Sequence, residues 1–285
     1  MNIFKDFKEE YQLGGLVQKI IFWNVGIFVV FSLLDVILKI SGSEINYIDY
    51  VALPSNFNEF IFRFWTILTY IFIHADFWHL LFNVIVLWFS SRYFLYFFTT
   101  KQFSFVYFFG GIFAGLVFLI CYQFLGINTK LVGASGSILA VLMAVTVYSP
   151  YTQVKLLLIG IVKLWHICFF VLFLDLIQMP FVNFGGHLAH FGGAFFGFIY
   201  MKLLQNGTDL SKITTIINNF FQKRQSTPFK KVHVNPKKPA QNRPSKIVVK
   251  DKTQQQIDEI LDKISQSGYD SLTAEEKEFL FRAGK

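Results

Sequence analysis

Residues of the kinds that catalyse acyl transfer stand at separate points within long apolar stretches of this chain. Ser135 lies between glycines in the run Gly133-Ala134-Ser135-Gly136, and two histidines, His187 and His190, lie in a glycine-rich run over 185–193. A serine hydroxyl becomes a nucleophile when a neighbouring histidine accepts its proton. These runs therefore predict a serine-histidine site, provided that the fold brings the two runs together.

A third group of polar residues lies near residue 80. His79 and Asn83 are four residues apart, and His74 precedes them. Residues four apart on a helix share one face, so we expect His79 and Asn83 to point into a single cavity. Polar groups in apolar spans are costly and require a functional or structural reason. With Ser135 and a histidine, this pair supplies each role that acyl transfer requires.

Each motif also has a simpler interpretation. Small residues in membrane helices often serve helix packing, and a single buried histidine is often structural. Zinc binding is a further alternative, which would use His74, His79, His187 and His190. The chain lacks a His-Glu-x2-His run, and we expect no nearby carboxylate or thiolate ligand. The sequence therefore predicts neither a metal site nor a cofactor.

The elements that must position these residues are membrane helices. Of the 285 residues, 54% are hydrophobic and only 15% are charged, against about 25% charged in an ordinary soluble domain. Long apolar blocks predict an all-α, polytopic membrane bundle with six transmembrane helices. We expect these spans at 18–40, 66–98, 103–125, 134–149, 153–177 and 186–204.

Two of the predicted spans are unusual. The second block is longer than a bilayer requires, so its first part is expected to be a re-entrant or interfacial lead. The fourth is short and opens at Gly133-Ala134-Ser135-Gly136. A helix that starts partway into the membrane leaves free backbone N–H groups at its start, inside a protein cavity. Lys163 and His166 are unexpected within the fifth span.

Basic residues are concentrated before the first span, near 92–101 and after the last span. With an even number of spans, this distribution predicts a cell inner-membrane protein whose termini are both cytoplasmic. The same distribution explains the net charge of +8 without nucleic acid as a partner.

The chain divides into four segments by composition. A cytoplasmic lead at 1–17 precedes the membrane domain at 18–205, which is followed by a basic, proline-containing linker at 206–250 and a helical segment at 251–285. The linker has a basic cluster at 223–243. Two interpretations of this cluster remain open: contact with anionic lipid, and a linker that is simply solvated. In the last segment we expect a helix over 255–266, then a second helix with Thr273 as N-cap and Leu280 and Phe281 as its apolar face.

The ordered set of motifs resembles the rhomboid family of intramembrane serine proteases. The resemblance covers about residues 15–204, the six-span core, and rests on the following residues: His74, His79, Asn83, Gly133-Ala134-Ser135-Gly136, Ala189-His190-Phe191-Gly192-Gly193 and Gly197. It implies that Ser135 attacks a scissile carbonyl in a transmembrane substrate, with His190 as the base. It further implies that Asn83, His79 and the Ser135 N–H hold the oxyanion, without an acidic third member.

The family's Ala-His-x-Gly-Gly pattern selects His190 rather than His187 as the base. We expect His187 nearer the outer mouth, as a rim or hydrogen-bonding residue. Gly193 and Gly197 would let the sixth span approach the fourth.

The chain also departs from the pattern. Some members carry an aromatic residue where this chain has Leu139, and Arg63 with Trp65 replaces an adjacent Trp-Arg pair. The main alternative is a catalytically inactive rhomboid-like protein that binds transmembrane helices. A transporter or channel is a weaker one, because paired carboxylates and inverted repeats are not evident.

Overall fold

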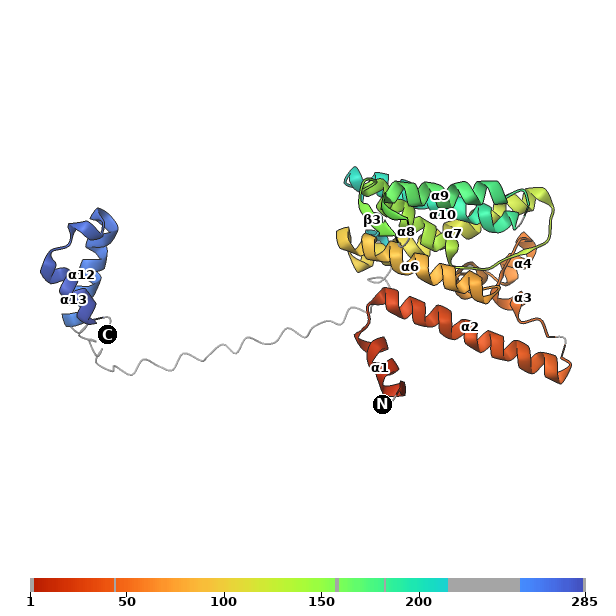
Figure 1. Cartoon of the computed structure of the whole chain (residues 1–285), viewed down its shortest axis with the longest axis horizontal. Coiled ribbons are helices and arrows are strands. Elements are labelled where there is room, and N and C mark those ends of the chain that lie inside the picture. Colours follow the sequence, from red (N-terminus) through yellow and green to blue (C-terminus); the bar gives the residue numbers. More distant parts are fainter. Residues whose placement is uncertain (1–2, 44, 157–158, 182, 215–251, 284–285) are drawn as a thin grey trace, which may run out of the picture. The chain divides into compact units, whose positions relative to one another are not determined.

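A computed structural model of the protein describes residues 3–43, 45–156, 159–181, 183–214 and 252–283 (Figure 1). The chain divides into two compact units, Met1–Gln225 and Ser226–Lys285, and each is described by itself. The basic cluster predicted at 223–243 and most of the predicted linker lie outside the described residues.

Helices dominate the first unit. The longer ones are α1 (Ile3–Leu13), α2 (Leu16–Ser41), α6 (Phe77–Phe97), α7 (Thr100–Leu125), α8 (Ser135–Tyr148), α9 (Leu164–Gln178) and α10 (Phe184–Gln205). Four short helical segments lie between α2 and α6: α3 (Ile48–Val51), α4 (Phe57–Phe62), α5 (Thr66–Thr69) and η1 (Tyr70–Phe72). The predicted helical fold is therefore confirmed, and α2 runs along the edge of the bundle that α6 to α10 form (Figure 1).

Among the described residues, three helices are long and apolar enough to cross a bilayer: α2, α6 and α7. The helices α8 and α9 are also apolar but shorter. The count of six spans therefore stays a prediction. The long second block is divided, since α5 and η1 precede a separate α6 that begins after Asp76, and the interfacial or re-entrant position of its first part stays a prediction. The Asp76 carboxylate accepts a hydrogen bond from the His79 N–H at 2.9 Å and so caps α6.

The predicted fifth span is wrong at its start. Instead of a helix, its first part contains two strands that pair in antiparallel fashion, β3 (Gln153–Leu156) and β4 (Gly160–Lys163), and α9 begins only at Leu164. Polar and apolar residues alternate along β3, which suits a strand with one buried face. Lys163 therefore lies before the helix, where its ammonium group is 5.3 Å from the ring centroid of Tyr151.

Helix α8 lies at the centre of the bundle. It packs against α10, α7, α6 and α9, most extensively against α10. Most of its side chains are buried, including Leu139 and Val141. A helix of 14 residues is about 21 Å long, against about 30 Å for the hydrocarbon core of a bilayer. Because protein surrounds it, α8 can begin well inside the molecule and present its first residue to an internal site.

Glycines on α10 allow its close approach to α8. A Cβ atom added at Gly193 would overlap the backbone carbonyl of Gly136, and one added at Gly197 would overlap that of Ala140. The backbones of the two helices are therefore in direct contact along one α10 face, as the sequence pattern predicted. This contact lies beside Ser135 on one helix and one turn from His190 on the other.

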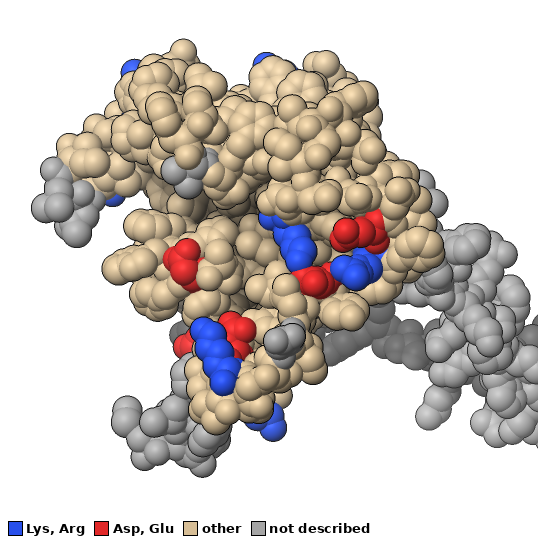
Figure 2. Space-filling model, turned by 90° about the vertical axis from the view of Figure 1, so that its right-hand side faces the viewer, with Lys and Arg blue, Asp and Glu red and all other residues tan. Residues whose placement is uncertain are grey.

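The segment between α2 and α6 is fixed by side chains that reach back along the chain. Arg63 Nη1 donates to the Asp49 carbonyl at 2.7 Å, and Trp65 Nε1 donates to the Tyr50 carbonyl at 2.8 Å. Nearby, β1 (Leu53–Pro54) pairs with β2 (Lys130–Leu131). Figure 2 shows charged side chains in a few small clusters on an otherwise uncharged face. Large exposed apolar side chains such as Val30 and Phe169 are expected where lipid replaces water.

The second unit is a pair of helices, α12 (Lys252–Ser267) and α13 (Ala274–Ala283), joined by a short 3₁₀ turn, η2 (Tyr269–Ser271). Thr273 caps α13 as predicted: its Oγ1 accepts from the Glu276 N–H at 3.3 Å, and its N–H donates to the Glu276 carboxylate at 2.7 Å. The predicted apolar face is wrong at Phe281, whose side chain is exposed. Phe279 instead lines a cavity with Ile260 of α12.

Candidate active site

Ser135 is the first residue of α8 and follows a turn that requires glycine. Gly133 has φ of 123°, a conformation that residues with a Cβ atom rarely adopt, and its N–H donates to the Tyr70 carbonyl at 3.0 Å. The turn places the half-buried Ser135 hydroxyl at the start of the helix. The first backbone N–H groups of a helix have no partner within it, so they can bind negative charge.

His190 comes from the first half of α10, and its Nε2 lies 2.5 Å from the Ser135 Oγ. The two residues are 55 positions apart in the sequence and meet because the Gly193 contact holds α10 against α8. The structure therefore brings together the two residues whose pairing the sequence predicted. At this distance the hydroxyl proton can pass directly to the imidazole.

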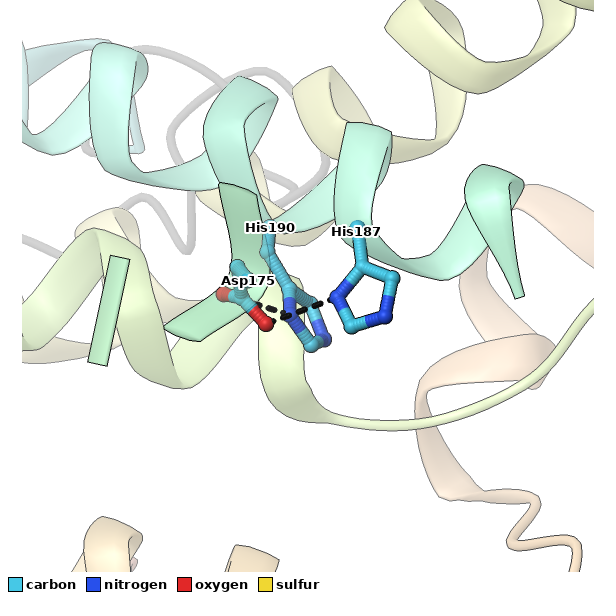
Figure 3. A group of neighbouring side chains, drawn as sticks. All are labelled: Asp175, His187 and His190. Atoms are coloured by element: carbon cyan, nitrogen blue, oxygen red, sulfur yellow. Dashed lines mark hydrogen bonds and ion pairs between the residues drawn. The ribbon is translucent and has the colours of Figure 1, made fainter. Parts of the chain in front are cut away.

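A carboxylate completes this group, which corrects the expectation that no acid lies near the histidines. Asp175 of α9 has one oxygen 2.9 Å from the His190 Nδ1 and the other 2.8 Å from the His187 Nδ1 (Figure 3). An ionised carboxylate only accepts hydrogen bonds, so each Nδ1 carries a proton. The Nε2 atom of a neutral His190 is then unprotonated and faces the serine hydroxyl.

Of the two roles expected for His187, the structure shows hydrogen bonding and not a place at the rim. Its side chain is buried, with 11% of its area exposed, and it shares the Asp175 carboxylate with His190. The ligand-capable atoms of Asp175, His187 and His190 lie within 4.8 Å of one another. The expectation that no carboxylate lies near the histidines, which counted against zinc binding, is therefore wrong. In the structure, both oxygens of the carboxylate already accept hydrogen bonds from the histidines.

The polar residues at and before the start of α6 lie near the turn that precedes Ser135. A Cβ atom added at Gly133 would come within 2.8 Å of the His79 ring, so this ring lies against the turn before the serine. His74 is buried, and its ring centroid is 5.2 Å from that of His79. Asn83 lies one turn along α6 from His79 and is buried as well.

The side-chain amide of Asn83 is one of several buried polar groups without a hydrogen-bond partner among the described residues, and both ring nitrogens of His74 are others. Within the described part of the chain, the Asn83 Nδ2 is buried without a hydrogen-bond acceptor. A buried unpaired donor costs about 1–3 kcal/mol, so such a group calls for an explanation. A donor held ready for a transient negative charge is one explanation that fits a residue beside His79 and the start of α8.

Asp175 is the site residue that motif reasoning missed. A carboxylate in a 15-residue apolar helix was visible in the sequence and is itself a signal of function in a membrane protein. Its partners could not be read from spacing, because α9 and α10 are separate helices with an intervening turn. The remaining predicted residues, Gly136 and Gly197, lie in helix contacts.

Comparison with known families gives two matches along the chain. A model of the Rhomboid domain matches residues 62–206, just over half of the 285 residues. A family of unknown function, DUF6576, matches residues 248–283. No curated protein matched the chain. The rhomboid match and the long apolar helices identify an integral membrane protein. The match contains Ser135, His190 and Asn83, and the chain therefore belongs to the rhomboid family.

Proposed function

We propose that this protein is an intramembrane serine endopeptidase that cleaves transmembrane segments of other membrane proteins. The observation that carries the proposal is the 2.5 Å distance between the Ser135 Oγ and the His190 Nε2. A nucleophile within hydrogen-bond reach of an oriented base is the minimum requirement for acyl transfer. Membership in the rhomboid family supports the same reaction class.

In the proposed reaction, the Ser135 Oγ attacks the carbonyl carbon of the scissile peptide bond. The hydroxyl proton passes to the His190 Nε2, and the imidazolium then gives it to the leaving amine. Water, activated by the same Nε2, hydrolyses the acyl-enzyme and regenerates Ser135. Substrate carboxylate and amine are the products, and no cofactor takes part.

Three donors are assigned to the oxyanion of the tetrahedral intermediate: the Asn83 side-chain amide, the His79 ring and the Ser135 backbone N–H. What supports Asn83 is its buried Nδ2, which has no acceptor within the described residues. What supports His79 is the position of its ring against Gly133. Fixed donors in a water-poor site stabilise developing charge without reorganisation.

The site also needs water at membrane depth. His74 and His79, together with Asn83 and the buried His187, provide a polar lining in which water can be retained. We further propose that the protein lies in the cell inner membrane with both termini in the cytoplasm, from the distribution of basic residues. Anionic lipid is a proposed partner of the basic segment after α10.

The test is cleavage of a single-span test substrate by the purified protein in proteoliposomes. Wild type is compared with Ser135→Ala and His190→Ala. Two control variants change the same residue types at exposed positions, Ser41→Ala at the end of α2 and His166→Ala in α9. The proposal expects loss of cleavage in both site variants and full cleavage in both controls.

Two results would count against this proposal. Cleavage that persists in Ser135→Ala would exclude the serine mechanism. A folded wild type that binds several single-span segments but cleaves none of them would identify an inactive, helix-binding rhomboid protein instead.

A further inference from the structure

We propose that Asp175 is a positioning residue for His190, so that Ser135, His190 and Asp175 form a three-residue relay of hydrogen bonds. His187 supports this relay by binding the second oxygen of Asp175. The inference rests on the proposed function, since it concerns how His190 acts as a base. It adds a carboxylate that the serine and histidine motifs do not contain.

The geometry of the carboxylate carries the inference. The two oxygens of Asp175 accept from two different imidazoles, at 2.8 Å from the His187 Nδ1 and at 2.9 Å from the His190 Nδ1 (Figure 3). The two histidines lie one turn apart on α10, with rings 5.8 Å apart and nearly perpendicular at 88°. Both rings therefore meet Asp175 from one helix, and the carboxylate cannot rotate without losing a donor.

Burial of the Asp175 carboxylate costs folding free energy, so its presence calls for an explanation. Only 10% of the Asp175 side chain is exposed, and it lies on the apolar helix α9. A carboxylate removed from water is destabilising unless it is hydrogen-bonded on its available lone pairs. Two imidazole N–H donors supply those bonds here. A purely structural contact between α9 and α10 would be served equally well by apolar side chains of similar size.

The carboxylate decides which nitrogen of His190 faces the serine. Neutral imidazole carries one proton, on either Nδ1 or Nε2. Because Asp175 accepts from Nδ1, the proton stays there, and the Nε2 lone pair is left for the Ser135 hydroxyl. During the reaction, the hydroxyl proton moves to Nε2 while the Nδ1 proton remains in place. Asp175 stays ionised and balances the imidazolium that forms.

His187 has a different part in the relay. Among the described residues its hydrogen bond is to Asp175 and not to Ser135, and it fixes the second oxygen of that carboxylate. Its removal leaves the Asp175–His190 bond intact, so its loss should matter less than the loss of the carboxylate. A graded series of effects is therefore expected along the relay, largest at Ser135 and His190, then at Asp175, then at His187.

The kinetic test compares wild type with Asp175→Asn, Asp175→Leu and His187→Leu in proteoliposomes. We expect kcat to fall about 100-fold or more in both Asp175 variants, by analogy with removal of the acid from a serine triad. KM should change less than about threefold, because Asp175 does not touch the substrate. The His187 variant should lose about tenfold or less. Asp35→Asn, a carboxylate change in helix α2, is the matched control and should leave kcat unchanged.

The rate at which a fluorophosphonate probe labels Ser135 separates base function from substrate binding. This rate should fall in parallel with kcat in both Asp175 variants. Equal labelling of wild type and Asp175→Asn would overturn the inference while leaving the serine mechanism standing.

A second readout does not depend on turnover. Nitrogen-15 NMR of labelled histidine side chains reports which ring nitrogen of His190 carries the proton, with His190→Gln used to assign the signal. In wild type the proton should be on Nδ1, and in Asp175→Leu this preference should be lost. If wild type neither cleaves nor labels, the proposed function fails, and the NMR comparison alone then decides about Asp175. An Nδ1 proton that persists in Asp175→Leu would overturn the inference.

Discussion

The substitution Gly193→Ala tests whether the contact between α10 and α8 controls the site. The added Cβ atom would overlap the Gly136 carbonyl, next to Ser135. The carbonyl belongs to the α8 backbone, and an alanine Cβ is fixed to its own backbone without a rotatable bond, so no side-chain rotation relieves the overlap. To restore ordinary van der Waals contact, α10 must move away from α8 by about 1 Å or more at this level.

The effect on the reaction follows from the neighbouring distance. The Ser135 Oγ lies 2.5 Å from the His190 Nε2. A displacement of about 1 Å stretches this distance to about 3.5 Å, the outer limit of a hydrogen bond. A misplacement of this size costs about 100-fold in rate. We therefore expect Gly193→Ala to lower kcat about 100-fold with a smaller change in KM.

The assay is cleavage of the single-span substrate in proteoliposomes, paired with a thermal melt in detergent. The overlap should also lower the free energy of unfolding by about 1–3 kcal/mol. Gly26→Ala is the matched control, because a Cβ atom added at Gly26 on α2 meets nothing within 4 Å. Full activity in a normally folded Gly193→Ala protein would refute the reasoning, since the two backbones could then separate without parting Ser135 from His190.

Four further outcomes are expected. Asn83→Ala should lower kcat about 100- to 1,000-fold, as loss of one oxyanion donor does, whereas an unchanged kcat would show that the other donors suffice. Treatment with EDTA should leave cleavage unchanged, because both Asp175 oxygens already accept from histidines; loss of cleavage that zinc restores would contradict this. Deletion of 215–285 should preserve cleavage and the melting temperature. Deletion after 206 should lower the melting temperature, because it also removes Asp209, whose carboxylate accepts hydrogen bonds from Tyr200 and Gln102. Equal melting temperatures of the two truncated proteins would contradict this. Hydrogen bonds from Lys263 and from the Thr273 N–H lower the pKa of Glu276 from its ordinary value of 4.5. The stability that these bonds give to the α12–α13 pair should therefore be present above pH 4.5 and lost as the pH falls through the lowered pKa. The measurement is hydrogen exchange of the α12 and α13 amides in the full chain, compared between wild type and Glu276→Gln at each pH. The extra protection in wild type should shrink towards low pH, and a difference that grows instead would contradict the prediction.

Local chemistry explains which elements could be predicted from the sequence. Helix α8 was expected at 134–149 and spans Ser135–Tyr148, because a glycine-rich turn and an apolar run mark its start and its body. The small residues at Gly193 and Gly197 predicted the close helix contact, since only glycine admits a facing backbone. These are properties of short stretches of chain and are visible in a single sequence.

The strand pair β3 and β4 shows where the same reasoning fails. Its apolar residues extend the block that becomes α9, so hydropathy alone joins the two. The alternation Gln153-Val154-Lys155-Leu156 has a period of two, and Gly160 adopts a φ of 93°. Both favour a strand and turn over a helix. The period was present in the sequence, but a four-residue pattern is too short to outweigh a long apolar run.

The role of Asp175 depends on tertiary structure and could not be read from the chain alone. Its partners lie 12 and 15 residues away on another helix. Only the packing of α9 against α10 decides that both imidazoles turn towards it. An acidic residue in an apolar helix indicates that a reason exists, but it does not name the partner.

The shared carboxylate has a consequence for how the proposed activity could be lost in this lineage. Within the described residues, the half-buried Ser135 hydroxyl makes one side-chain hydrogen bond, to His190, so its replacement by alanine removes chemistry and little stability. Loss of Asp175 would instead leave two imidazole donors without their acceptor, a change that selection on folding alone would oppose. Relatives of this chain that have become inactive should therefore have lost the serine first and kept the acid and both histidines. The pattern of surviving residues in such relatives would record the order in which the catalytic parts became dispensable.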